Sequence, residues 1–289
     1  MASVTVPVSS KDCSEGLEEA NAGARGRDDD AAVLSKLTRT IEGEVIPRLL
    51  LAHVLPSKAK QVDSSDWVMD PQEVQKFGEL IIACESTRAF RYIDDARRNG
   101  RPLENIITKL LAPSATYLGE LWKADQCSFT EVTVGLSRLR QILRELGPEF
   151  ENEKGAWRHG RRALLLPVPG EQHTFGVYVV EAFFRREGWD VYGGPVDTEK
   201  EITQLVEKQW FAVAGFSLSS ERFLDRLPPL IKSIRRRSCN RAIAILVGGP
   251  LFHSNPDLAA KVGADGSAAD AQEAVTQAGA LLGRISAKR

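Results

Sequence analysis

After residue 160 the chain alternates short apolar runs with longer amphipathic segments, and no other feature restricts its fold as strongly. Strands that are buried on both faces are apolar throughout, whereas half-exposed strands alternate apolar and polar residues. The amphipathic segments have the length of helices that connect parallel strands. We therefore predict a parallel sheet with helices on both faces. The predicted strands are residues 162–168, 189–194, 211–217, 242–249 and 264–268.

Residues 31–150 show a different pattern, in which apolar residues recur every three or four positions. Such spacing places them on one face of a helix, so we predict an all-helical bundle, with a kink at Pro113. One such series is Val132, Leu136, Leu139, Leu143 and Leu146. The predicted fold class is an α-helical bundle followed by an α/β domain with a flavodoxin- or Rossmann-like parallel five-stranded sheet. Within that domain, the helix over residues 222–237 is expected to be strained or broken at Pro228 and Pro229.

The predicted domains are a disordered tail (1–30), a helical cap bundle (31–150), a linker (151–160) and the α/β domain (161–289). The tail is rich in small and polar residues and cannot bury enough apolar surface to offset its ordering entropy. The linker is polar and contains glycine.

Composition excludes several classes of protein. The net charge of −1 gives no long-range attraction to nucleic acid or to anionic membranes. No apolar run is long enough for a membrane span, and the N-terminus lacks the basic start and apolar core of a secretory signal. The four cysteines form no CxxC pair, which argues against a zinc site and a disulfide scaffold. We expect a cytoplasmic protein.

The loop over residues 167–176, PVPGEQHTFG, carries the strongest candidate site. In an open parallel sheet, ligands bind beyond the carboxyl ends of the strands, where this loop lies. The neutral imidazole of His173 suits a metal such as cobalt or iron, and Glu171 would accept the other ring N–H. Gly176 would let the next helix begin close to a bulky group. The alternative is an exposed histidine that caps a helix.

Two further loops carry weaker signals. In GFSLSS (215–220), Ser217 and Ser219 would hydrogen-bond the amides of a flat ligand; the alternative is a helix N-cap. In VGGP (247–250), Gly248 and Gly249 remove two Cβ atoms and would open a slot; the alternative is a simple turn.

Taken in this order, the three loops resemble the cobalamin-binding Rossmann-like domain, which carries DxHxxG, SxS and GG after its first, third and fourth strands. The matching segments here are GEQHTFG, SLS and VGGP. The resemblance implies that His173 replaces the nucleotide base of cobalamin and coordinates cobalt from the lower face. It also implies that the two serines and the two glycines line a groove for the nucleotide tail. Glu171 departs from the family's aspartate, which leaves the carboxylate–imidazole geometry open.

The helical half adds to this resemblance. YLGELWKADQCSFTEV is similar to the last part of the helical cap in methionine synthase and in light-sensing cobalamin regulators, which implies that Trp122 covers the upper face of the corrin. The alternative for Trp122 is a core aromatic. The Glu-His pair of CarH-type photoreceptors is replaced by Val132 and Thr133. His53 would supply a second axial ligand if the first helix folds over the corrin, but we prefer a partly buried histidine near a helix C-terminus.

The combination of ExHxxG, a short helical cap and a disordered N-terminus is similar to the AerR/PpaA antirepressors of photosynthetic bacteria, and EVIPRLLLAHVLP (44–56) and GEQHTFG resemble that group in particular. This similarity implies a light-responsive, non-enzymatic regulator that binds cobalamin and acts on a redox-responsive repressor of photosystem genes (PpsR/CrtJ type). The hydroxo, methyl and adenosyl forms of cobalamin all stay open, and haem is the alternative cofactor.

Two other functions stay open: a corrinoid protein that carries methyl groups for a methyltransferase, and an interaction module without a cofactor. Direct DNA contact through the basic residues near 235–237 is less favoured than a solvated helix end.

Overall fold

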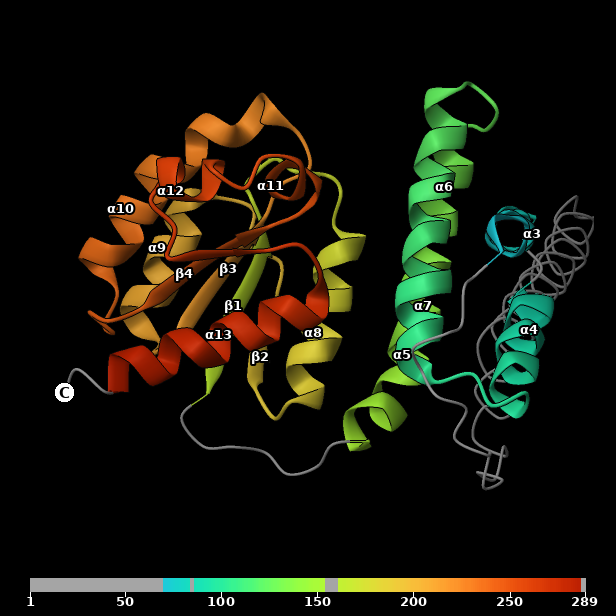
Figure 1. Cartoon of the computed structure of the whole chain (residues 1–289). Helices are drawn as coiled ribbons and strands as arrows, with labels where there is room; N and C mark the ends of the chain where they lie inside the picture. Colours follow the sequence, from blue (N-terminus) through green and yellow to red (C-terminus); the bar gives the residue numbers. More distant parts are fainter. Residues whose placement is uncertain (1–69, 84–85, 154–160, 287–289) are drawn as a thin grey trace, which may run out of the picture. The chain divides into compact units, whose positions relative to one another are not determined.

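The computed structural model of the chain describes residues 70–83, 86–153 and 161–286 (Figure 1). The predicted tail, most of the predicted linker and His53 lie outside these residues. The domain boundaries therefore stay a prediction. No helix in the described ranges has both the length and the apolar character that a bilayer crossing requires.

The described residues before 154 form helices and no strand, as predicted. The last of these helices, over Phe129–Asn152, has the clearest sequence signals, because Ser128 and Glu131 form a capping box at its start. Four of the five apolar residues of its predicted stripe are buried. The elements are α3 (Pro71–Ile82), α4 (Ser86–Arg98), α5 (Leu103–Asn105), the π-helix η2 (Ile106–Leu111), α6 (Ala112–Lys123) and α7 (Phe129–Asn152).

The distortion predicted at Pro113 takes the form of the π-helical segment that precedes it. Proline has no N–H to donate to the carbonyl four residues earlier. The N–H of Ala112 donates instead to the carbonyl of Ile107, five residues back. The π-helical segment η2 therefore supplies backbone hydrogen bonds directly before the proline, where a regular α-helix would lose one.

The sheet has five parallel strands in the order β2-β1-β3-β4-β5, which confirms the predicted fold class. This is the strand order of the flavodoxin-like fold. Both faces of β1 are buried, as expected for a parallel sheet between two layers of helices. The strands are β1 (Arg162–Pro167), β2 (Asp190–Tyr192), β3 (Val213–Ser217), β4 (Ala244–Gly248) and β5 (Gly266–Ala268).

Helices cover both faces of this sheet, with α8 packed against α13 and α9 packed against α10 (Figure 1). The core between the sheet and the α9–α10 layer is built from large aliphatic and aromatic side chains such as Leu164, Ile202 and Ile231. The helices are α8 (Phe175–Arg186), α9 (Glu199–Lys208), the 3-10 helix η3 (Glu221–Arg226), α10 (Leu227–Arg237), α11 (Pro250–Ser254), α12 (Leu258–Val262) and α13 (Ala271–Ser286).

The helix predicted over residues 222–237, expected to be strained or broken at Pro228 and Pro229, is divided directly before these prolines. The chain forms η3 up to Arg226 and then begins α10 at Leu227, so the two prolines lie in the first turn of a new helix. Backbone N–H groups in a first turn have no intrahelical acceptor, so proline costs nothing there. Helix α11, directly after Gly249, was not predicted.

Candidate functional site

The three loops singled out from the sequence leave the sheet at neighbouring positions. Pro167, Ser217 and Gly248 are paired across β1, β3 and β4, so the loops that follow them start side by side at the carboxyl edge. The strand order reverses between β1 and β3, and sheets of this kind bind ligands at that switch point. The candidate site therefore lies where the loops after β1 and β3 separate.

Glu171 is the centre of the hydrogen bonding at this edge, and its side chain is only 3% exposed. Its Oε1 accepts the backbone N–H groups of Gln172 (2.8 Å) and His173 (3.0 Å) and also contacts Nδ1 of His173 (2.7 Å). Its Oε2 accepts the backbone N–H of Ser219 at 2.8 Å. A buried carboxylate thus holds both the imidazole and the loop after β3.

Glu171 is ionised at neutral pH. Burial raises the pKa of its carboxyl group, but the hydrogen bonds from His173 and Ser219 outweigh burial and hold the pKa below the ordinary glutamate value. Each of these donors stabilises the charged form, which would otherwise be costly in a buried position.

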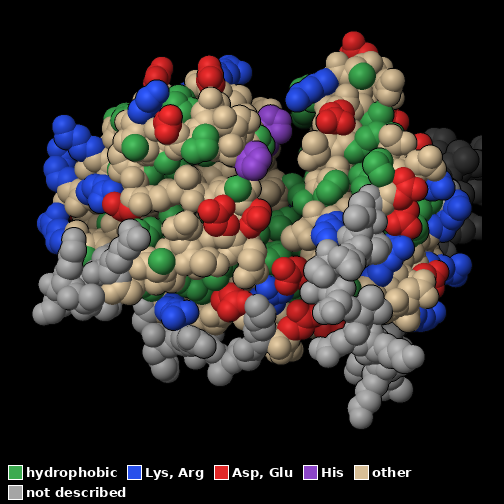
Figure 2. Space-filling view, in the orientation of Figure 1, with side chains coloured by type: hydrophobic (Ala, Val, Ile, Leu, Met, Phe, Trp, Pro, Cys, Tyr) green, Lys and Arg blue, Asp and Glu red, His purple; other side chains and the backbone are tan. Residues whose placement is uncertain are grey.

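The carboxylate determines which ring nitrogen of His173 is available to a ligand. A carboxylate can only accept hydrogen bonds, so we assign the proton to Nδ1, which leaves the lone pair on Nε2. The imidazole side chain is 63% exposed. Figure 2 shows imidazole groups at the surface of this part of the molecule. His173 therefore presents one oriented nitrogen donor to the outside of the sheet edge.

The alternative for His173, a helix cap, does not match the structure. The N-cap of α8 is Thr174, and the ring of His173 contacts Glu171 instead. Gly176 lies exposed in the first turn of α8, and a Cβ there would meet no atom within 4 Å. The start of α8 thus carries no side chain at this exposed position, and its role toward a bulky ligand stays a prediction.

The loop after β4 approaches the loop after β3 through glycine. Gly249 has φ +100°, a conformation that residues with side chains rarely adopt. A Cβ at Gly249 would lie 2.6 Å from the carbonyl oxygen of Leu218 and 3.0 Å from Oγ of Ser217. A Cβ at Gly248 would lie 3.2 Å from the carbonyl oxygen of Ala268. Both glycines therefore permit close contact between protein atoms at this edge, and the slot for a ligand stays a prediction.

The two serines play different parts from those expected. Ser219 contributes its backbone N–H to Glu171, whereas we had predicted a side-chain contact with a ligand. The sequence offered no direct signal for this bond, because Glu171 and Ser219 lie 48 residues apart. Ser217 closes β3 and lies against Gly249. Their roles toward a ligand stay predictions.

Trp122 lies near the end of α6 and is 44% exposed, so the alternative of a core aromatic is wrong. Its ring makes an edge-to-face contact with Phe129, with 6.2 Å between centroids, and Phe129 is itself 66% exposed. Two exposed aromatic rings at the turn between α6 and α7 are available to a flat apolar partner. Their contact with a corrin stays a prediction.

The basic cluster at the end of α10 is engaged in local ion pairs. Arg235 contacts Asp265 at 2.9 Å, and Arg237 contacts Glu207 at 2.8 Å. These contacts favour the interpretation of a solvated helix end over a DNA-binding surface.

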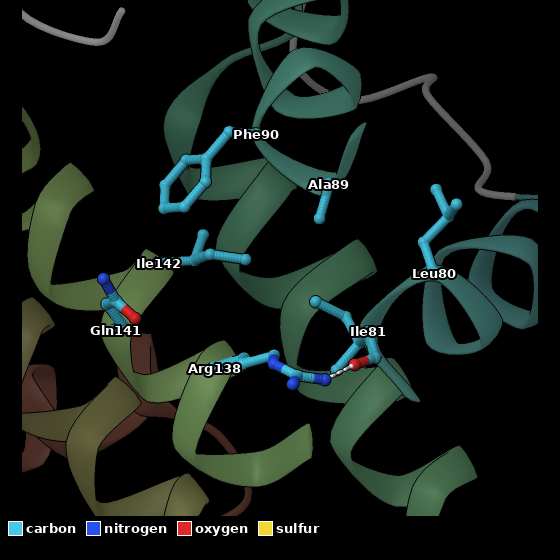
Figure 3. Close-up of a pocket in the computed structure, with 7 residues that line it drawn as sticks. All are labelled: Leu80, Ile81, Ala89, Phe90, Arg138, Gln141 and Ile142. Atoms are coloured by element: carbon cyan, nitrogen blue, oxygen red, sulfur yellow. Dashed lines mark hydrogen bonds between the residues drawn. The ribbon is translucent and has the colours of Figure 1, made fainter. Parts of the chain in front are cut away.

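A small hollow within the helical half is a poor alternative site (Figure 3). Its polar side chains are Arg138 and Gln141, and the guanidinium of Arg138 donates to the carbonyl oxygens of Ile81 and Ile82 at the end of α3. Arg138 thus caps a helix and stabilises the bundle. The other lining residues are Leu80, Ala89, Phe90 and Ile142, with Ile81.

Comparison with known proteins relates the α/β part of the chain to one family. Residues 161–276 match the family model of the B12 binding domain. An uncharacterized 20.5 kDa protein in the bchF-crtJ intergenic region of Rhodobacter capsulatus is 26% identical over 172 residues, which cover 60% of this chain and 89% of that protein. Dimethylamine corrinoid protein 2 of Methanosarcina acetivorans is 24% identical over 216 residues, or 72% of this chain and 95% of that protein.

A solved structure shows the same fold. The monomethylamine corrinoid protein of Methanosarcina barkeri superposes with a TM-score of 0.59 at 19% identity, covering 72% of this chain and 98% of that chain. The residues that match the B12 binding domain include the whole carboxyl edge described above.

Proposed function

We propose that this chain, which carries a domain of the B12-binding family over residues 161–276, is a non-enzymatic cobalamin-binding regulator with His173 as the lower axial ligand. One observation carries the proposal: Nδ1 of His173 is held by a buried, ionised carboxylate, which leaves Nε2 exposed at the switch point of the sheet. A single axial donor suffices for a metal that a macrocycle already holds through its own nitrogens.

The residues of the edge fit this ligand. Glu171 fixes the tautomer and the orientation of the imidazole, and its charge increases the basicity of Nε2. Gly176 leaves the start of α8 open, and Gly248 and Gly249 keep side chains away from the edge beside Ser217. When bound, cobalamin supplies a cobalt centre whose upper ligand can exchange or be released by light.

A regulatory role is supported by the relative from the bchF-crtJ intergenic region and by the similarity of ExHxxG and the short helical cap to the AerR/PpaA antirepressors. We infer that the partner is a redox-responsive repressor of the PpsR/CrtJ type. Light would act by changing the upper ligand, and the helical half with its exposed Trp122 would then bind or release the repressor.

A second candidate function is a corrinoid protein that carries methyl groups. The methylamine corrinoid proteins match this chain over nearly their whole length, which favours this candidate. It would use the same His173 and the same edge. The two functions differ in one measurable property, because a carrier must transfer its methyl group to an acceptor and a regulator need not.

The first experiment is an absorption spectrum of the full chain after loading with hydroxocobalamin and removal of free ligand. We expect a bound, coloured species for the parent and for His253→Ala, an exposed histidine on α11 that serves as the matched control. His173→Ala should lose the cofactor or change its coordination spectrum. Equal retention with an unchanged spectrum would remove His173 as the ligand. Stoichiometric binding of haemin in place of cobalamin would contradict the proposed cofactor.

The second experiment separates the two functions. Methyl-loaded protein is mixed with a PpsR/CrtJ-type repressor and the repressor's fluorescently labelled DNA site, in the dark and after illumination. The fluorescence anisotropy of the DNA reports how much repressor stays bound to it, and therefore how much the loaded protein has engaged. A light-dependent change in repressor binding without methyl transfer supports the regulator. Methyl transfer to a methyltransferase acceptor without repressor binding supports the carrier.

A further inference from the structure

The loop that presents His173 begins with a tight turn. The N–H of Glu171 donates to the carbonyl of Val168 at 2.8 Å, and Pro169 and Gly170 occupy the two central positions. Gly170 has φ +92°, as glycine has at the third position of a type II turn. The conformation of this turn determines where Glu171 and His173 emerge from the edge.

Helix η3, between β3 and α10, contacts this turn through Arg226 and Phe223. The guanidinium of Arg226 donates to the carbonyl oxygen of Pro169 at 2.8 Å and lies 4.8 Å from the centroid of the Phe223 ring. A Cβ at Gly170 would lie 3.1 Å from Nη1 of Arg226 and 3.2 Å from the Phe223 ring. Glycine is thus needed at position 170 both for its positive φ and for this close approach.

Both ends of the segment from Ser219 to Arg226 hydrogen-bond to the His173 loop. At one end the N–H of Ser219 donates to Glu171, and at the other Arg226 donates to Pro169. Phe223 packs against the hydrophobic core, and η3 continues directly into the buried Leu227 of α10. The loop is therefore attached to the core of the α9–α10 layer rather than held by its own turn alone.

We infer that Arg226 and Phe223 are positioning residues for His173: through the Pro169–Gly170 turn they set the orientation in which the imidazole is presented to its ligand. The identity of that ligand rests on the proposed function. The contacts that attach the loop are present in the protein without cofactor. They can therefore be measured separately.

The test uses the full chain with three variants. Arg226→Ala removes the donor to Pro169, and Arg226→Lys keeps a charged donor without the planar contact to Phe223. Arg222→Ala is the matched control, because Arg222 also lies over the Phe223 ring, at 5.2 Å, but from the start of η3. Arg226 and Arg222 are both exposed, so neither change leaves a cavity. Circular dichroism and thermal unfolding verify the fold of each variant.

The first measurement is hydrogen–deuterium exchange of the cofactor-free protein in the peptide that contains the amides of residues 171–173. Loss of one hydrogen bond from a charged donor should speed exchange about tenfold in Arg226→Ala. Arg226→Lys should lie between Arg226→Ala and the parent, and Arg222→Ala should match the parent. Equal exchange in Arg226→Ala and Arg222→Ala would overturn the inference, whatever the cofactor.

The second measurement is the electron paramagnetic resonance spectrum of the protein loaded with cobalamin and reduced to cobalt(II), with and without ¹⁵N-histidine. The histidine nitrogen contributes a splitting that changes with the isotope, so the spectrum reports the fraction of protein in which His173 is bound. We expect a several-fold smaller fraction in Arg226→Ala than in Arg222→Ala. Faster exchange with an unchanged bound fraction would overturn the positioning role. A parent without any isotope-sensitive splitting would contradict the proposed function and leave the exchange result standing.

Discussion

The backbone N–H of Ser219 donates to Oε2 of Glu171 at 2.8 Å, and this bond joins the loops that leave the sheet on either side of its switch point. The other oxygen of the same carboxylate contacts His173. One buried side chain thus connects the candidate metal ligand to the next strand's loop.

Glu171→Gln should lower the free energy of unfolding by about 1–3 kcal/mol at neutral pH, because an amide of the same size can accept fewer of the N–H groups that converge on the carboxylate. The variant should also bind cobalamin with an altered spectrum, since the amide no longer fixes the proton on Nδ1 of His173. Urea denaturation and absorption spectra test the two effects. The exposed Glu221, replaced by Gln, is the control and should change neither.

The pH dependence of stability should reveal the same group. The pKa of Glu171 is lowered in the folded protein, so its contribution is fully present above the ordinary glutamate pKa and is lost as the pH falls through that value and below it. The parent should therefore lose stability in acid more steeply than Glu171→Gln. Urea midpoints measured from neutral pH into this acid range test the prediction. Parallel curves for the two proteins would contradict it.

Glu181 should show the opposite behaviour. Burial raises the pKa of its carboxyl group, and the ion pair with Arg185 at 2.8 Å and the charge of Arg140 offset only part of that rise. The parent should then lose stability as the pH rises through this elevated pKa, whereas Glu181→Gln should not. Thermal unfolding of both proteins from mildly acidic to neutral pH compares them. The idea fails if Glu181→Gln is less stable than the parent by a constant amount at every pH.

Gly249→Ala should destabilise the fold by about 1–3 kcal/mol, because φ is +100° there and the new Cβ would press on the carbonyl of Leu218. Gly279→Ala is the matched control. Gly279 lies within α13, and a Cβ there would meet nothing within 4 Å, so alanine should stabilise the protein by about 0.5–1 kcal/mol. Urea denaturation of both variants measures the difference. A loss of similar size in both would argue against a tight approach at the loop after β4.

Trp122→Ala should change stability by no more than about 1 kcal/mol, because the ring is exposed and its main aromatic neighbour is Phe129. If the ring covers the corrin, the same variant should change the rate of the light-induced spectral change in methyl-loaded protein. Phe129→Ala serves for comparison, since Phe129 is more exposed than Trp122 and was not expected to cover the corrin. Identical photochemistry in the parent and Trp122→Ala would exclude the predicted contact.

Much of the fold followed from local pattern. The apolar runs after residue 160 predicted a five-stranded parallel sheet, and the strand order agrees with the flavodoxin-like type. The helical stripe between Val132 and Leu146 was also correct, because side chains on one helix face share a period that is visible in the chain itself. The break beside Pro228 and Pro229 was also expected, but not that both prolines lie in the first turn of a new helix, because helix propensity alone does not show whether a proline interrupts one helix or begins the next.

The pairing of Glu171 with His173 could be expected from their places in the chain, since two residues separated by one position in a loop lie within reach of each other in many loop conformations. The hydrogen bond from Ser219 to this carboxylate, and the contacts of Arg226 and Phe223 with the Pro169–Gly170 turn, could be found only in the folded protein. These contacts join residues about fifty positions apart, and they exist because parallel pairing of β1 with β3 brings two distant loops to the same edge. Local patterns specify that two strands form, whereas the packing of the whole sheet specifies which of their loop atoms meet.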